Sequence, residues 1–95
     1  MHAVIRHYHF APKDSNEIDQ KIADEFLPII RLAKGFVRYY WLDNGNGEGT
    51  SVSVFHDKDG ADDSVRLAAS YVHEHLADLM KQKPEIIEGP VVVHD

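Results

Sequence analysis

The sequence predicts an α+β fold of order β-α-β-β-α-β, with two helices on one face of a four-stranded antiparallel sheet. Three observations predict it. Alternating β-prone segments lie near both ends, two apolar stripes recur at helical spacing, and an aromatic segment is joined to another strand by a glycine-rich turn. The 95 residues, 43% of them hydrophobic, fit one domain with one core, spanning residues 1–95.

The first half of the chain predicts a strand and then a helix. Residues 3–10 alternate and are rich in β-branched and aromatic types. Asp14 and Glu17 have the spacing of a capping box, with Ser15 as an alternative cap. Pro28 should kink the helix or divide it in two, and Gly35 should end it. The apolar stripe of this helix consists of Ile18, Ile22, Phe26, Ile29, Ile30 and Ala33.

The second half predicts a hairpin, a second helix and a last strand. Residues 36–42 and 50–56 should pair as strands around a turn at residues 43–49. Residues 57–60 offer caps for the helix, and residues 81–84 should end it. The last strand, residues 85–94, is interrupted at Gly89-Pro90 and is therefore an edge or contains a bulge. The stripe of the second helix consists of Val65, Ala68, Ala69, Val72, Leu76 and Leu79.

Composition excludes several classes of function. Ten basic and 16 acidic residues give a formal net charge of -6, and the basic residues are scattered, which argues against nucleic acid and against an anionic membrane surface. The absence of cysteine excludes disulfides and thiolate chemistry. No apolar run approaches the ~20 residues that span a bilayer. We expect a cytoplasmic protein with no membrane or nucleic-acid partner.

Three local features carry a resemblance to a known family. They are Leu27-Pro28-Ile29-Ile30 followed by Lys34-Gly35-Phe36-Val37 and Tyr39-Tyr40, then Ser51-Val52-Ser53-Val54-Phe55 leading through Asp57 into a helix, and a short valine-rich C-terminal strand. With them, the chain resembles the dimeric α/β-barrel superfamily, in particular small proteins related to antibiotic biosynthesis monooxygenases, over nearly its whole length.

The resemblance implies a ferredoxin-like domain that forms a homodimer. It also implies a pocket between sheet and helices for an aromatic substrate that itself reduces oxygen, with no metal or flavin cofactor. Apolar residues on both strand parities independently predict that a second subunit covers the outer sheet face. The haem-degrading branch of the superfamily uses an Asn on the first strand. This strand has Arg6, His7, Tyr8 and His9 instead, which disfavours haem degradation.

Candidate catalytic residues lie on the second helix. Tyr71 and His75 are four residues apart and should share a face at the edge of the apolar stripe. The pair could act as a hydrogen-bond donor, Tyr71, and a base, His75, that deprotonates a phenol or quinol. The structural alternative is that both side chains lie at the boundary of the core and extend their polar atoms to water. The nearby His73-Glu74-His75 lacks the spacing and ligand count of a zinc site, so we predict no metal there.

Candidate binding residues lie on the strands. Arg6 and Tyr8 share one face of the first strand. His7 and His9 share the other, where two imidazoles would grip a metal or an anion or, as we favour, line a polar dimer interface. The remaining candidates are Tyr39 and Trp41 on the second strand, beside Ser51 and Ser53; they either hold a planar ligand or pack as core.

The leading hypothesis is a homodimer that binds a small aromatic or quinone-like molecule and oxidises it without a cofactor. In it His75 is the base, Tyr71 and Arg6 are its hydrogen-bond and charge partners, and Tyr39 and Trp41 form a stacking wall. The alternative is a non-enzymatic dimeric binding or stress-related module, and a third hypothesis is an isomerase or lyase on the same scaffold.

Overall fold

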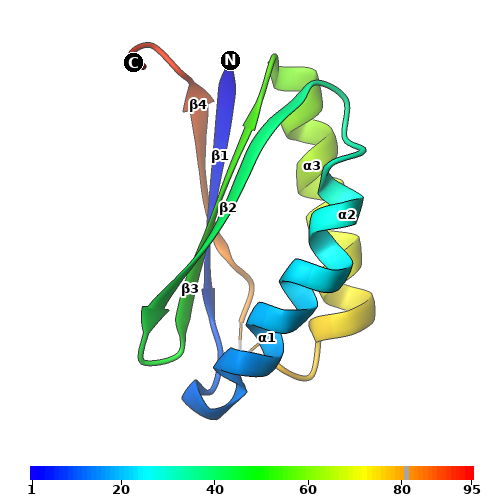
Figure 1. Cartoon of the computed structure of the whole chain (residues 1–95), viewed down its shortest axis with the longest axis vertical. Coiled ribbons are helices and arrows are strands. Elements are labelled where there is room, and N and C mark those ends of the chain that lie inside the picture. Colours follow the sequence, from blue (N-terminus) through cyan, green and yellow to red (C-terminus); the bar gives the residue numbers. More distant parts are fainter. Residues whose placement is uncertain (81) are drawn as a thin grey trace.

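The computed structural model describes every residue except Lys81 and has the predicted architecture. Four antiparallel strands form one sheet in the spatial order β2-β3-β1-β4. All the helices lie on the same side of it (Figure 1). The strands are β1 (His2–His9), β2 (Phe36–Gly45), β3 (Glu48–Phe55) and β4 (Glu85–Pro90).

The helical segments are irregular. They are the 3₁₀ turn η1 (Pro12–Asp14), helix α1 (Ser15–Lys21), the π-helical segment η2 (Ile22–Phe26), helix α2 (Leu27–Ile30), helix α3 (Lys58–Tyr71) and the π-helical segment η3 (Val72–Leu76). The predicted division at Pro28 is confirmed, since a new helix begins at Leu27 with this proline in its first turn. Pro28 cannot donate to the carbonyl of Asp24, and the wider π turn lies at that point.

The hairpin between β2 and β3 is tighter than predicted. The seven-residue turn at residues 43–49 is wrong, because β2 continues to Gly45 and β3 begins at Glu48. Only Asn46 and Gly47 lie between the strands, both with positive φ (56° and 81°), which is the conformation of a two-residue turn that follows the twist of the strands.

Two other local predictions need correction. Neither Asp14 nor Ser15 caps a helix: Asp14 makes no side-chain cap hydrogen bond, and the Ser15 hydroxyl instead donates to Asp43 across 2.5 Å. The last strand ends at Pro90 rather than at residue 94, since proline has no N–H for the ladder. The predicted cap of the second helix is confirmed, because the Asp57 carboxylate accepts from the backbone N–H of Gly60 at 3.1 Å.

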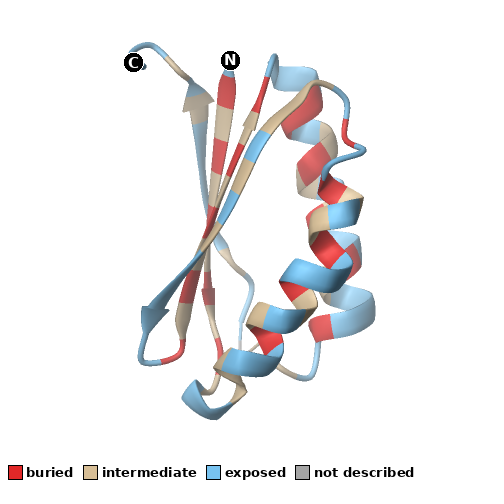
Figure 2. Cartoon of the chain, in the orientation of Figure 1, coloured by how far each residue is buried: buried red, intermediate tan, exposed pale blue. Residues whose placement is uncertain are grey.

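The core lies between the helices and the inner sheet face, where the buried residues gather in Figure 2. Along β1 the even-numbered residues are buried and the odd-numbered residues are half-buried, so the two faces differ clearly. The buried set combines β1 and β3 side chains with Ile18, Ile22, Phe26 and Ile30 from the first helical arm and Ala61, Ala68, Tyr71 and Leu76 from the second.

The outer sheet face carries an apolar band that no helix covers. Strand register aligns Ile87, Ile5, Val52 and Tyr40 in one row across all four strands. Ile87 is 69% exposed and Tyr40 is 53% exposed. The predicted apolar character of both sheet faces is therefore present in the single chain. Among the described residues, none of the helices is long and apolar enough to cross a membrane.

Candidate functional site

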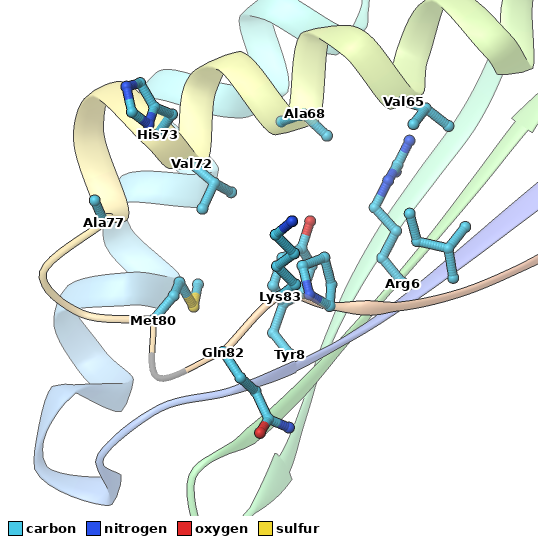
Figure 3. A pocket seen from close by; sticks show the side chains of 13 residues that line it. Arg6, Tyr8, Val65, Ala68, Val72, His73, Ala77, Met80, Gln82 and Lys83 are labelled. Atoms are coloured by element: carbon cyan, nitrogen blue, oxygen red, sulfur yellow. The ribbon is translucent and has the colours of Figure 1, made fainter.

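A cavity of about 480 Å³ lies between the C-terminal half of the second helical arm and the inner face of β1 and β4. Figure 3 shows it bounded by α3 and η3 on one side and by β1 and the segment before β4 on the other. Most of the lining is apolar. It consists of Val65, Ala68, Ala69, Val72, Ala77, Met80, Pro84 and Ile86, with Arg6, Tyr8, His73, Gln82 and Lys83 as the polar members.

The cavity exists because the helix above it presents small side chains. Ala68 and Ala69 of α3 and Ala77 beyond η3 line the cavity, and their single methyl groups leave the space above β1 open. Gln82 and Lys83 are exposed, and Ile86 is 45% exposed. The mouth of the cavity therefore lies near the start of β4, within reach of solvent.

Arg6 is the charged group of the cavity wall, and it is 1% exposed. One guanidinium nitrogen donates to the Ser64 hydroxyl at 3.0 Å, and another lies 3.5 Å from the Ser53 hydroxyl. Its Nε has no hydrogen-bond partner. Within the part of the chain that the structure describes, no carboxylate forms an ion pair with Arg6, although buried charges in proteins are normally paired.

Burial lowers the pKa of Arg6 below its usual value, and the nearby Tyr8, Tyr39 and Glu88 offset part of this effect. A lowered pKa means that the folded state disfavours the charged form relative to the unfolded chain. This cost in stability is present at every pH below the folded-state pKa, neutral pH included, because an arginine this basic stays protonated there. An incoming anion would relieve the cost.

The electrostatic balance of the cavity opposes that of the whole protein. The chain has a net charge of -6, yet the described lining contains two basic side chains, Arg6 and Lys83, and no aspartate or glutamate. Tyr8 adds a phenol; burial raises its pKa, while the positive charge of Arg6 lowers it in part. The cavity thus offers hydrogen-bond donors and positive charge in apolar surroundings, which suits an anionic ligand.

Two predicted residues, Tyr39 and Tyr71, meet in a void beside the cavity. It is only about 10 Å³ in volume and shares Tyr8, Ala68, Val72 and Met80 with the larger space. Phe26 packs between the two tyrosines, 5.6 Å from the ring of Tyr39 and 5.2 Å from that of Tyr71. This space is too small for an aromatic ligand, so here the aromatic side chains pack as core.

The Tyr71 hydroxyl is engaged away from the large cavity. It donates to Glu25 Oε1 at 2.8 Å, and the carbonyl oxygen of Lys21 is 3.2 Å away. Burial, the hydrogen bond to Glu25 and the charge of that carboxylate together raise the pKa of Tyr71. Tyr71 therefore links α3 to the first helical arm as a neutral hydrogen-bond donor.

His75 shares a face with Tyr71, as predicted, with the two rings 5.0 Å apart. Its side chain is 48% exposed, however, and it does not line the cavity. The histidine that does is His73. His73 lies in the π-helical segment η3, as His75 does. The catalytic role predicted for His75 stays a prediction.

Trp41 lies outside the cavity lining. Its indole N–H donates to Asp19 at 2.8 Å, and its ring lies 5.8 Å from that of Tyr8. The ring also lies over Gly49, where an added Cβ would be 2.5 Å from it. Trp41 thus contacts Tyr8 without lining the cavity itself. Tyr8, Lys83, Met80 and His73 are lining residues that the sequence prediction missed.

Comparisons with known proteins agree with the fold. No protein-family model matches the chain, and no curated protein matches it. Among solved structures, a protein of unknown function from Nitrosomonas europaea is 18% identical, with a TM-score of 0.83 and coverage of 99% of this chain and 91% of that one. The chain therefore has the same fold as this protein.

Two further solved structures of the same fold are named as monooxygenases. A provisionally assigned antibiotic biosynthesis monooxygenase from Nitrosomonas europaea is 11% identical, with a TM-score of 0.80 and coverage of 98% and 100% of the two chains. The ActVA-Orf6 monooxygenase of Streptomyces coelicolor, solved with nanaomycin D, is 11% identical, with a TM-score of 0.73 and coverage of 98% and 92%. The predicted resemblance to antibiotic biosynthesis monooxygenase-like proteins is confirmed as a shared fold.

The unpaired guanidinium predicts that replacing Arg6 by an apolar residue will stabilise the protein. Replacing Arg6 by Met, of similar length, removes a buried charge that lacks a counter-ion, and we expect the free energy of unfolding to rise by about 1 to 3 kcal/mol. Urea denaturation followed by circular dichroism measures this. Arg31→Met, at an exposed position on the helical side, is the control and should change little. A loss of stability in Arg6→Met would mean that the arginine is a structural element of the core.

Proposed function

We propose that this protein binds a small, flat, anionic aromatic molecule, such as a phenolate or a hydroxyquinone, in the cavity above β1. The observation that carries the proposal is the buried Arg6 guanidinium, held by serine hydroxyls alone and left with an unpartnered Nε at the wall of an apolar cavity. The volume, about 480 Å³, is in the range of small-molecule pockets. The ligand's ring would lie against Tyr8, Val72 and Met80, with its anionic oxygen on Arg6.

A matched pair of probes tests the charge requirement. 2-Hydroxy-1,4-naphthoquinone is an anion at neutral pH, whereas 1,4-naphthoquinone is neutral and of nearly the same shape. We expect the anion to bind at least tenfold more tightly, because a charge-assisted hydrogen bond contributes about 1.5 to 3 kcal/mol. Isothermal titration calorimetry gives both affinities. In Arg6→Met the preference should disappear, and in Arg31→Met it should persist; equal affinities in the wild type would overturn the proposal.

We further propose that the bound molecule is oxidised by dioxygen without a cofactor, as the fold's monooxygenase members suggest. Arg6 would stabilise the substrate phenolate, the electron-rich form that reduces oxygen. The overall change is balanced: a phenol and O₂ give a quinone and water, the substrate supplies all four electrons, and one oxygen atom enters the product. The phenolic proton would pass to an imidazole, and His73 lies at the rim.

Oxygen uptake separates catalysis from binding. With 1-naphthol as substrate, we expect the wild type to consume oxygen and Arg6→Met to lose at least tenfold in kcat/KM. His73→Asn should lower the rate by about tenfold or more, as for a proton acceptor. His75→Asn is the matched control and also tests the role predicted from sequence. A rate that falls only in His75→Asn would show that His75, not His73, accepts the proton.

A non-enzymatic binding module remains the second candidate function. It is favoured by the position of the acid–base groups: the Tyr71 hydroxyl faces Glu25, and the His75 side chain faces solvent. Tight, Arg6-dependent binding of 2-hydroxy-1,4-naphthoquinone with no oxygen consumption by any phenol tested would select this alternative.

We also propose that two copies of the chain associate through their outer sheet faces. The row of Ile87, Ile5, Val52 and Tyr40 spans the whole sheet, and a second copy of the same sheet is the occupant whose apolar band matches it in length and pleat. Val92 and Val93, each 86% exposed beyond β4, would add apolar surface beside this band.

Light scattering tests the dimer. We expect twice the mass of the chain at micromolar concentration. Ile87→Glu should give a monomer without unfolding, because this side chain is 69% exposed in the single chain. Leu32→Glu changes an even more exposed leucine (86%) that follows α2 on the helical side and should leave the dimer intact. A monomer mass for the wild type would contradict this part of the proposal.

A further inference from the structure

A second group of polar side chains lies on the outer face of the sheet, on the opposite side from the cavity. It consists of His7 and His9 from β1, Glu48 from β3 and Glu85 from β4. The ligand-type atoms of His7, His9 and Glu48 all lie within 4.8 Å of one another. Within the described residues, no other group of three histidine, aspartate or glutamate side chains is gathered this closely.

Strand register creates this group. Residues two apart on a strand project from the same face, so His7 and His9 are neighbours, with ring centroids 4.8 Å apart. Antiparallel pairing places Glu48 opposite His9 and Glu85 opposite His7. The closest contacts are diagonal: His7 Nε2 lies 2.8 Å from Glu48 Oε1, and His9 Nε2 lies 3.4 Å from Glu85 Oε1.

The hydrogen bonds of His7 orient its ring as a ligand. The Thr50 hydroxyl donates to Asn44 Oδ1 at 2.6 Å, so its oxygen accepts from His7 Nδ1 at 3.1 Å. With the Nδ1 proton held in this way, the neutral imidazole presents the lone pair of Nε2 toward the Glu48 carboxylate. Two acceptor atoms 2.8 Å apart repel unless a proton or a metal ion lies between them.

We propose that His7, His9 and Glu48 bind a divalent transition-metal ion of the zinc type, through Nε2 of each histidine and one carboxylate oxygen. Two imidazoles and a carboxylate form a recurrent zinc ligand set, with a fourth position left for water or for Glu85. A second hydrogen bond that fixes the tautomer of a ligating histidine, here donated by His7 Nδ1 to the Thr50 hydroxyl oxygen, is the usual companion of such a site.

The required movement is small. Zinc bonds of about 2.0 to 2.2 Å bring the ligand atoms of a tetrahedral site to roughly 3.3 Å from one another. The present separations of up to 4.8 Å close by side-chain rotation alone, because the histidine side chains are each 30% exposed and the Glu48 side chain is 42% exposed. The strands need not move.

Titration with zinc chloride tests the proposal. Calorimetry should show one ion bound per chain, and His9→Ala and Glu48→Gln should each weaken binding at least tenfold. His56→Ala and His94→Ala, both at exposed positions outside the group, should bind as the wild type does. Glu48→Gln keeps the size of the side chain and so keeps the result interpretable if His9→Ala folds poorly.

A second measurement tests the geometry of the site. Cobalt(II) in a four-coordinate site absorbs visible light intensely, whereas cobalt bound to scattered surface groups stays six-coordinate and pale. We expect the intense spectrum in the wild type and its loss in Glu48→Gln. Thr50→Val should weaken zinc binding about tenfold and keep the spectrum, as for a positioning residue. The absence of zinc binding, or equal binding by the wild type and Glu48→Gln, would overturn the proposal.

Discussion

The desolvated guanidinium of Arg6 is the constraint on which this account of the cavity depends. A charge buried under α3 with only serine hydroxyls as partners is costly, and burial lowers its pKa accordingly. Sequences that need only a stable core place an apolar residue at such a position. The small Ala68 and Ala69 in the cavity lining leave the space open instead of filling it. Charge and space together are the two features on which the proposed anion site rests.

Side chains alternate between the two faces of β1, so this strand contributes to both the cavity and the outer face of the sheet. Its even-numbered residues face the helices and give Arg6 and Tyr8 to the cavity, and its odd-numbered residues give Ile5 to the outer apolar band and His7 and His9 to the polar group beside it. Because one strand supplies both faces, a one-residue slip in its register would exchange them. The contact between the rings of Tyr8 and Trp41, 5.8 Å apart on the inner face, would be lost in such a slip.

Much of the fold could be predicted from the sequence, because period and turn chemistry are local signals. Pro28 predicts the interruption of the first helical arm. Gly35 and the glycines of the hairpin turn predict where the chain reverses direction. The site was harder to predict. Regular helical spacing predicts that His75 faces the pocket, whereas His73 is the histidine that lines it. Both residues lie in the π-helical segment Val72–Leu76, which no proline signals in the sequence. The approach of Glu48 and Glu85 to the histidines depends on strand order and on a two-residue turn, which are not local properties.

The most direct measurement is the nuclear magnetic resonance signal of the Arg6 Nε–H group, assigned by its loss in Arg6→Lys. In the free protein this proton has no acceptor, so we expect a weakly hydrogen-bonded signal. On saturation with 2-hydroxy-1,4-naphthoquinone it should move downfield and become protected from exchange, while the Nε–H signal of Arg31 stays in place. An Arg6 signal that does not change while the ligand binds would place the anion elsewhere and contradict the central claim.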